Sequence, residues 1–404
     1  MGSDSSTPSG DDQDLALVEA QLYITRIQQS LGTRLPGFVE PMVEMPQDLM
    51  DQAVRRKWFD VVFALNHANA IAARIQDEDF RPYLTALGAA AAESGDFALM
   101  AKALVVEIEF LDHAVYNDRV TAKLARAVAL LETGRGSAVM RPSAYTMCSL
   151  AYRHAQLWPI VEEMTVRAIE ATDVPVSETL QPILINSRRT AVYNQAYAIV
   201  SIAAQAYEID HRDRIPRWKR SFELHVKKEL FNGVQMWWED LMSVYDLISA
   251  LAGESPRFRI PDIEQIQARY SDKIGVAYLM LADAVRRSDA GDAKAAGELA
   301  EQANAILERH PYELGQGTRS AAYTLGLYLA AKAPPVSAAA GRYAHQLNYF
   351  RERARAQMIA ADYDRRDMES RRLVAELASS AVRDRPAGPV GRNADPPEGL
   401  SRTR

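Results

Sequence analysis

The chain has 404 residues, of which 48% are hydrophobic, 25% are charged and 8% are aromatic, and its formal net charge is −6. This composition is typical of a soluble globular protein, and the acidic balance excludes an overall field that would attract DNA or an anionic membrane. A single cysteine, Cys148, excludes an intrachain disulfide and a site made of several thiolates, so we expect a reducing, cytoplasmic environment.

Nearly every segment repeats its apolar residues with a helical period, and few segments alternate strictly, so we predict an all-α fold. Residues 1–12 are rich in Ser, Gly and Asp and are expected to form a disordered tail. Residues 13–78 are expected to form N-terminal helices. One runs over 13–31, and a second runs unbroken from Pro46 to Ala73 with its apolar side chains on one stripe.

The first helical hairpin is predicted over residues 80–94 and 97–116. In such a hairpin a small residue at the position of Gly88 would let the two helices cross closely. Gly95 can adopt the unusual dihedral angles of a tight turn, and Asp96 can cap the helix that follows. The segment therefore predicts two packed antiparallel helices joined by a short turn.

Weaker hairpin patterns follow along the rest of the chain. We predict helical repeats over 79–252, a connector over 253–261, further repeats over 262–350, a long helix over 351–384 and a disordered tail over 385–404. Within the repeats, further helices are expected at 120–132, 143–155, 159–171, 186–209, 215–231, 233–251, 262–287, 294–309 and 317–333.

An uncharged run over residues 190–207 is long enough to imitate a membrane span. It contains Asn194, Gln195 and Gln205, whose side-chain amides would be costly in lipid. We therefore interpret it as a buried helix and expect no membrane contact. Pro182 is expected to lie in the connector before this helix.

Residues 80–111 resemble a tetratricopeptide repeat. The resemblance rests on residues at or near the family spacing, namely Leu84, Leu87, Gly88, Ala91, Gly95, Asp96 and Phe97. Residues 277–307 and 319–350 are similar more loosely, through Leu281-Ala282 and Leu325-Gly326. The resemblance implies a superhelical array of degenerate hairpins with a continuous concave surface.

The arrangement also resembles the sensory half of actinobacterial signalling proteins, in which a repeat array runs through a long helix into a diguanylate cyclase domain. The Arg- and Glu-bearing helix over 351–384 suggests this likeness. The cyclase motif is absent from the sequence. The likeness therefore implies a ligand-sensing module of cyclic-dinucleotide signalling that lacks its output domain.

Candidate catalytic and metal-binding residues were weighed against structural roles. The seven histidines are far apart and none has a partner at metal-ligand spacing, so we expect no metal and no cofactor. Cys148 lies in an apolar helical run and is expected to pack in the core. The basic residues from Arg212 to Lys228 could contact nucleic acid, but nearby acidic residues favour a solvated helix face. We expect no nucleic-acid partner.

Trp237 and Trp238 are adjacent on a predicted helix, so their indoles point about 100° apart. Both can be core residues, or one can line a groove and anchor a peptide or ligand. We name Trp238, Tyr245 and Arg220 as candidate groove residues.

The sequence favours a non-enzymatic regulatory or scaffold protein that binds a peptide, a protein or a small signal on a concave face. No catalytic residues are assigned. The alternatives are the ligand-sensing module and an all-helical enzyme with scattered catalytic residues. A transcription-linked regulator is a further alternative, although no helix-turn-helix domain precedes the repeats. The helix over 351–384 can either mediate homodimer formation or cap the last hairpin.

Overall fold

The computed structural model describes residues 10–32, 46–112, 118–154, 157–230, 238–256, 274–309 and 316–332. These residues form fourteen α-helices, one π-helical turn and one 3-10 turn. No strand occurs among them. The predicted all-α class is therefore confirmed for the part of the chain that the structure describes.

The described helices have the following bounds in chain order. In the N-terminal half they are α1 (Gly10–Gly32), α2 (Gln47–Arg56), α3 (Phe59–Ile75), α4 (Arg81–Ser94), α5 (Phe97–Glu107), α6 (Asp118–Glu132), α7 (Met140–His154) and α8 (Trp158–Glu170). They continue with α9 (Gln181–Glu208), α10 (Ile215–Leu230), α11 (Trp238–Leu251), α13 (Ile274–Asp289), α14 (Ala293–Arg309) and α15 (Gln316–Lys332). A π-helical turn, η1 (Ile108–Asp112), continues α5, and a 3-10 turn, η2 (Arg212–Arg214), precedes α10.

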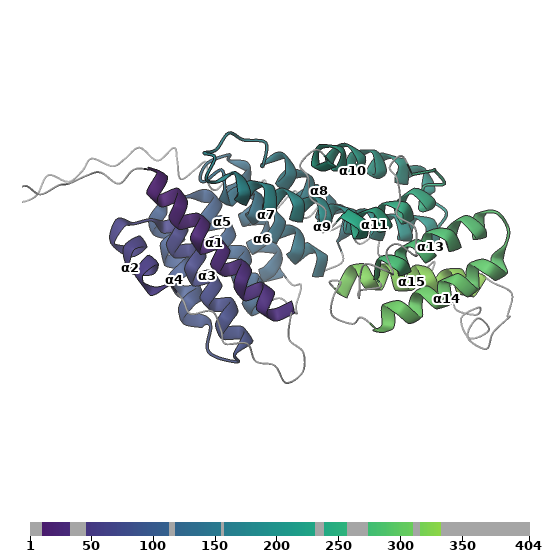
Figure 1. The fold of residues 1–404 in the computed structure, drawn as a ribbon, viewed down its shortest axis with the longest axis horizontal. Coiled ribbons are helices and arrows are strands. Elements are labelled where there is room, and N and C mark those ends of the chain that lie inside the picture. The colour runs from purple at the N-terminus through teal and green to yellow at the C-terminus, as the bar shows by residue number, and fades with distance from the viewer. Residues whose placement is uncertain are drawn as a thin grey trace, which may run out of the picture.

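Neighbouring helices pack in pairs in chain order. α3 packs against α4, α4 against α5, α5 against α6, α7 against α8, α13 against α14, and α14 against α15. Figure 1 shows α1 to α4 at one end of the molecule and α13 to α15 at the other. The predicted sequential packing of helix pairs is thus present. Among the described helices the chain also folds back, so that α15 packs against α9 and contacts α7.

The central helix is α9, which contacts α7, α8, α10, α11 and α15. Every residue from Ala191 to Glu208 is buried except Tyr193, which is partly buried. The uncharged run is therefore a helix surrounded by other helices, as predicted. None of the described helices, α9 included, combines the length and apolar character that a membrane crossing requires.

Two predicted boundaries were wrong. The helix expected from Pro46 to Ala73 is two helices, because Lys57 takes a left-handed conformation with φ 56° and ends α2. The amide of Trp58 then donates to the carbonyl of Ala53 at 2.9 Å, and the Trp58 side chain is buried. Pro182 lies in the first turn of α9 rather than in a connector, where a proline costs no hydrogen bond.

The predicted ends of the chain fall largely outside the described residues. α1 begins at Gly10, inside the segment predicted as a disordered tail. Residues 253–256 of the predicted connector are non-helical. The helix predicted over 351–384 and the tail over 385–404 lie outside the described part of the chain.

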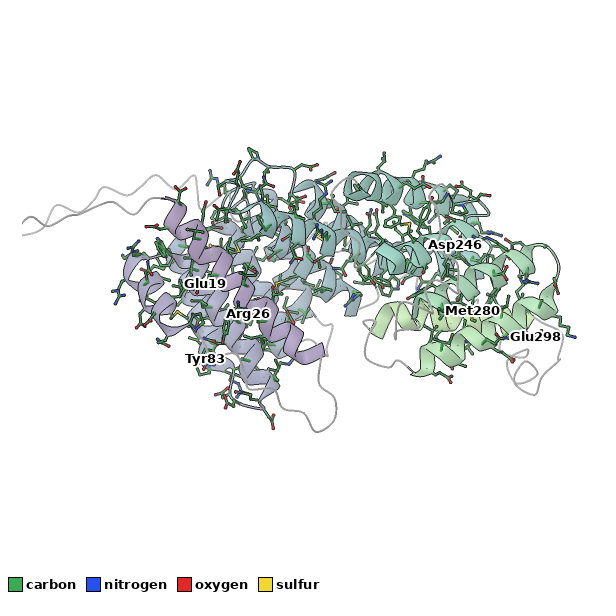
Figure 2. The ribbon with its side chains drawn as sticks, in the orientation of Figure 1. Glu19, Arg26, Tyr83, Asp246, Met280 and Glu298 are labelled. Carbon is green, nitrogen blue, oxygen red and sulfur yellow. The ribbon has the colours of Figure 1, made fainter. Side chains whose placement is uncertain are left out.

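Polar contacts fasten the second half of the described fold. Asp246 of α11, labelled in Figure 2, accepts a hydrogen bond at 3.1 Å from Arg286 of α13. Arg212 donates to the carbonyls of Ala250 and Leu251 at 3.0 and 2.8 Å. It thereby satisfies two carbonyls in the last turn of α11, where the helix offers them no partner. Arg212 also lies 2.9 Å from Asp289 of α13. The turn η2, through Arg212, therefore contacts both α11 and α13.

Candidate functional site

A groove with a volume of 510 Å³ lies between α4, α5 and α6. α4 lines it with Arg81, Leu84, Thr85, Leu87, Gly88, Ala91 and Ala92. The α5–η1 segment contributes Met100, Ala103, Leu104, Glu107 and Leu111, and α6 contributes Arg126 and Leu130. The lining residues recur three, four and seven positions apart on α4 and α5, so each helix presents one of its faces to the groove.

Small side chains on α4 create the hollow. Gly88 and Ala92 face the longer side chains of Met100 and Leu104 across the groove. A Cβ atom placed on Gly88 would meet no atom within 4 Å. The expectation that Gly88 permits a close helix crossing was therefore wrong, because the space beside it is open groove and not a neighbouring backbone.

The turn between α4 and α5 fixes the two helices that form most of the wall. Gly95 ends α4 in the left-handed conformation with φ 63°. The carboxylate of Asp96 accepts hydrogen bonds from the amides of Ala98 and Leu99 at 2.8 and 3.0 Å. It also accepts one at 2.6 Å from the amide of Ser137, which precedes α7. The predicted turn and cap are confirmed, and the cap also joins two consecutive hairpins.

Among the described residues, the charged side chains that line the groove are Arg81, Glu107 and Arg126. The carboxylate of Glu107 lies 2.8 Å from the Lys123 ammonium and 3.8 Å from the Arg119 guanidinium. Arg81 lies 3.6 Å from Asp79 at the solvent-exposed end of α4. Arg126 is exposed and makes no hydrogen bond or ion pair with the described residues. Two guanidinium groups therefore flank an apolar surface whose one carboxylate is already neutralised.

Leu111 adds an apolar edge to this surface. Its side chain is 44% exposed, which makes it one of the few large hydrophobic residues outside the core of the described chain. It belongs to η1, the π-helical turn in which α5 continues. Wide helical turns of this kind often occur at functional sites. An exposed leucine beside an apolar hollow marks a surface that another molecule can cover.

The titratable groups with the largest pKa shifts lie in the core and not in the groove. Burial lowers the pKa of His67 from 6.5 to about 3, and the charge of Lys102 lowers it further. Burial also lowers the pKa of Lys102 from 10.5 to about 8. Burial raises the pKa of the Cys148 thiol to about 12, in keeping with its predicted place in the core. None of the three lines the groove.

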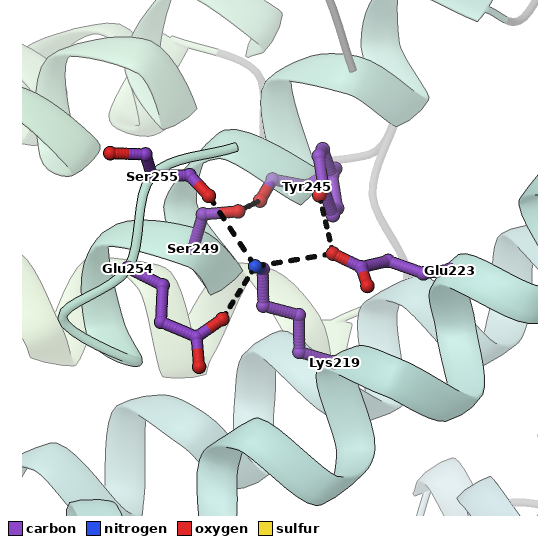
Figure 3. A network of polar contacts seen from close by, with 6 residues as sticks. All are labelled: Lys219, Glu223, Tyr245, Ser249, Glu254 and Ser255. Atoms are coloured by element: carbon purple, nitrogen blue, oxygen red, sulfur yellow. Dashed lines mark hydrogen bonds and ion pairs between the residues drawn. The ribbon is translucent and has the colours of Figure 1, made fainter. Parts of the chain in front are cut away.

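A second polar cluster joins α10 to the segment after α11, and Figure 3 shows it. The Lys219 ammonium lies 3.1 Å from Glu223 and 2.7 Å from Glu254, and the Lys219 side chain is 1% exposed. The Tyr245 hydroxyl donates to the same Glu223 carboxylate at 2.6 Å. The predicted solvated basic face therefore has a core residue at Lys219, which is unavailable to nucleic acid.

The structure places two of the three groove residues predicted from the sequence, Tyr245 and Arg220, in different surroundings. Tyr245 is 0% exposed and packs against Phe222, with ring centroids 5.9 Å apart. Arg220 is exposed on α10. Trp238 begins α11, and its side chain, like Trp237, lies outside the described residues. A groove role for Trp238 and Arg220 stays a prediction.

Sequence reasoning missed Arg126 and Leu111. The small residues of α4 were visible as a Gly- and Ala-rich stretch, but their spacing alone does not separate an open hollow from a close crossing. Comparison of the chain with protein-family models, with curated proteins and with solved structures found no match. No group of three or more His, Cys, Asp or Glu residues in the described part of the chain could hold a metal ion.

Proposed function

We propose that this chain is a non-enzymatic regulatory or scaffold protein, built from tetratricopeptide-like hairpins, that holds a peptide segment of a partner protein in the groove of α4, α5 and α6. The observation that carries the proposal is the open space at Gly88. A glycine inside a helix costs about 0.5–1 kcal/mol relative to alanine. At this position no neighbouring atom requires it, so its effect is to keep the groove wide.

The chemistry of the groove supports a peptide ligand. Leucine, methionine and alanine side chains form its floor, and arginine side chains lie at its edge. An apolar hollow with a few polar groups at fixed positions is the usual composition of a binding site. An amphipathic helix is recognised in such grooves by its apolar residues three, four and seven positions apart.

The groove offers little for catalysis. Its titratable lining groups are Arg81, Glu107 and Arg126, and Glu107 is held by two cations. A general acid or base works best when its pKa is tuned close to the working pH. The groups whose pKa values are most strongly shifted, His67, Lys102 and Cys148, are enclosed in the core instead. This distribution supports binding over the enzyme alternative.

The test is selection of peptides from a random library displayed on phage, with the full chain as bait. The selected peptides are then measured on the wild type, on Gly88→Trp and on Ala89→Trp. Gly88→Trp fills the hollow, since the added atoms enter open space. Ala89→Trp is the matched control, because Ala89 is exposed on the same helix and does not line the groove.

We expect the selected peptides to bind the wild type and Ala89→Trp equally and to lose at least about tenfold in affinity on Gly88→Trp. Circular dichroism should report equal helix content in the three proteins. Equal binding to all three would show that the peptides use another surface. A selection that enriches no peptide would contradict the proposal.

A further inference from the structure

We infer that the occupant of the groove is an acidic amphipathic helix, with an apolar stripe for the floor and carboxylates on both flanks. The inference rests on the proposed function and deepens it by naming the class of partner. It depends on the charges around the groove and not on its volume.

The two flanking charges stand on different helices. α5 packs against both α4 and α6, and so forms the middle of the surface. Arg81 belongs to α4 and Arg126 to α6, so one guanidinium lies on each side of the apolar floor. Carboxylates are the natural partners of these groups, because a guanidinium donates two parallel hydrogen bonds to them.

The chain itself leaves this positive charge available. Arg126 has no ion-pair or hydrogen-bond partner among the described residues. Arg81 faces Asp79 at 3.6 Å, and both side chains are well exposed, at 75% and 61%, so solvent weakens their attraction. Glu107 would repel an acidic ligand, but Lys123 at 2.8 Å and Arg119 at 3.8 Å offset its charge.

The shape of the floor favours a helix as the occupant. The lining of α4 runs from Arg81 to Ala92, a length of about 16 Å or three helical turns. A partner helix of roughly 14 residues spans this length with one turn to spare. Its leucines at i, i+3, i+4 and i+7 would meet Leu84, Leu104 and Leu111, and carboxylates beside that stripe would reach the two arginines.

The experiment uses three fluorescent peptides with blocked ends, identical leucine positions and either Glu, Gln or Lys on both flanks. Fluorescence anisotropy with the full chain gives their affinities. We expect the Glu peptide to bind about tenfold more tightly than the Gln peptide, and the Lys peptide to bind most weakly. Added salt should reduce the preference for Glu, since the paired charges remain partly exposed.

Two variants assign the preference to Arg126. Arg126→Glu should lower the affinity of the Glu peptide at least about tenfold and raise that of the Lys peptide. Lys294→Glu makes the same change in net charge on α14 and is the control, because Lys294 is exposed and lies outside the groove. Both variants alter exposed side chains without partners among the described residues, so we expect both to fold.

The outcomes separate this inference from the proposed function. Equal affinity for the three peptides, or equal effects of Arg126→Glu and Lys294→Glu, overturns the acidic helix. If Gly88→Trp still abolishes binding of library-selected peptides in that case, the groove binds peptides without regard to their charge. If none of the three designed peptides binds the wild type, the inference is also overturned, and the library selection decides the function by itself.

Discussion

Two buried lysines show how differently the two halves of the molecule treat a charge. Lys219 of α10 is 1% exposed and meets Glu223 and Glu254 at 3.1 and 2.7 Å. Lys102 of α5 is 4% exposed, and its ammonium has no carboxylate partner among the described residues. Its ammonium lies 3.7 Å from the sulfur of Met140 and 5.6 Å from the centroid of the Phe63 ring. The charge of Lys219 is therefore balanced by two carboxylates, whereas the charge of Lys102 is buried without one among the described residues and destabilises the fold.

The largest expected effect is at Lys219. Lys219→Met removes the cation from Glu223, which is 7% exposed and would remain charged in the core. Breaking a buried ion pair on one side destabilises a protein by about 3–5 kcal/mol. Urea unfolding should show this loss, and hydrogen exchange should place it in α10 and α11.

The control for Lys219 is the double variant Lys219→Met with Glu223→Gln. The glutamine keeps an acceptor for the Tyr245 hydroxyl and carries no charge. It should recover most of the lost stability, since removing both members of a buried pair is often close to neutral. A double variant as unstable as the single one would mean that packing, and not the loss of the Lys219 charge beside Glu223, explains the lower stability.

Lys102→Met should raise the free energy of unfolding, whereas Lys219→Met lowers it. Methionine keeps the length of the side chain and removes the buried charge, and burial has lowered the pKa of Lys102 from 10.5 to about 8. At pH 7 the folded chain still carries this charge, and the lowered pKa means that keeping it in the core costs about 3 kcal/mol, so the variant should be more stable by about that amount. The measurement is urea unfolding at pH 7.

The advantage of Lys102→Met should shrink in alkaline solution. Between pH 8 and pH 10.5 the unfolded wild type binds a proton at Lys102 that the folded state does not bind. The stability of the wild type therefore rises with pH in this window. An advantage that stays constant from pH 7 to pH 10.5 would show that the Lys102 ammonium is not destabilising.

His67 extends the same comparison to acid. Its folded-state pKa is about 3 and its ordinary value is 6.5, mainly because of burial. Between these values the unfolded chain binds a proton at His67 and the folded chain does not, so the folded state loses stability as the pH falls. From pH 6.5 to pH 5 the loss is about 2 kcal/mol. His67→Leu should lack this part of the acid sensitivity when unfolding is compared at pH 7 and pH 5.

The control for His67 is the variant Lys102→Met. Lys102 is the one titratable partner whose charge lowers the pKa of His67. In Lys102→Met the acid sensitivity should therefore persist but become smaller. Identical losses in the wild type and in His67→Leu between pH 7 and pH 5 would mean that carboxylates elsewhere govern the acid response.

The lysine comparison also marks the limit of sequence reasoning. The helical period predicted the positions of α4, α5 and α14 well, and the pair Gly95-Asp96 predicted the turn between α4 and α5. Both signals depend only on residues close together in the sequence. The break at Lys57 carries no glycine or proline, so the chain has no local signal for it. Lys219 appeared to lie on a solvated basic face, since its burial depends on Glu254, far along the chain.

The groove escaped prediction for the same reason. Its floor and its flanks depend on how α6 lies against α5, which brings Arg126 beside a hollow made by α4. The sequence contained both parts, but nothing in the spacing of either helix sets their distance. The sequence predicts a close helix crossing at Gly88, whereas the structure places open groove there.

The smallest expected effect is a difference in stability between alanine substitutions at Gly88 and Gly326, the glycines of the two Leu-Gly pairs. Gly88 faces open space, whereas a Cβ on buried Gly326 would overlap the side-chain amide of Asn304. That amide donates to the carbonyl of Tyr323 at 3.3 Å. Gly88→Ala should stabilise the chain by about 0.5–1 kcal/mol through helix propensity alone. Gly326→Ala should destabilise it by about 1 kcal/mol, because the overlap outweighs the same gain.

Thermal unfolding of the two alanine variants measures this difference, and equal shifts of the same sign would contradict it. The affinity of both alanine variants for the selected peptides is measured as well. If Gly88→Ala raises the melting temperature and also weakens the selected peptides, the wild type retains a less stable residue where it keeps the groove open. In that case glycine at position 88 lowers the stability of the fold and favours ligand binding, which is the compromise between stability and activity expected at a functional site. Gly326→Ala should lower the melting temperature and leave peptide affinity unchanged, because Gly326 belongs to α15 and does not line the groove.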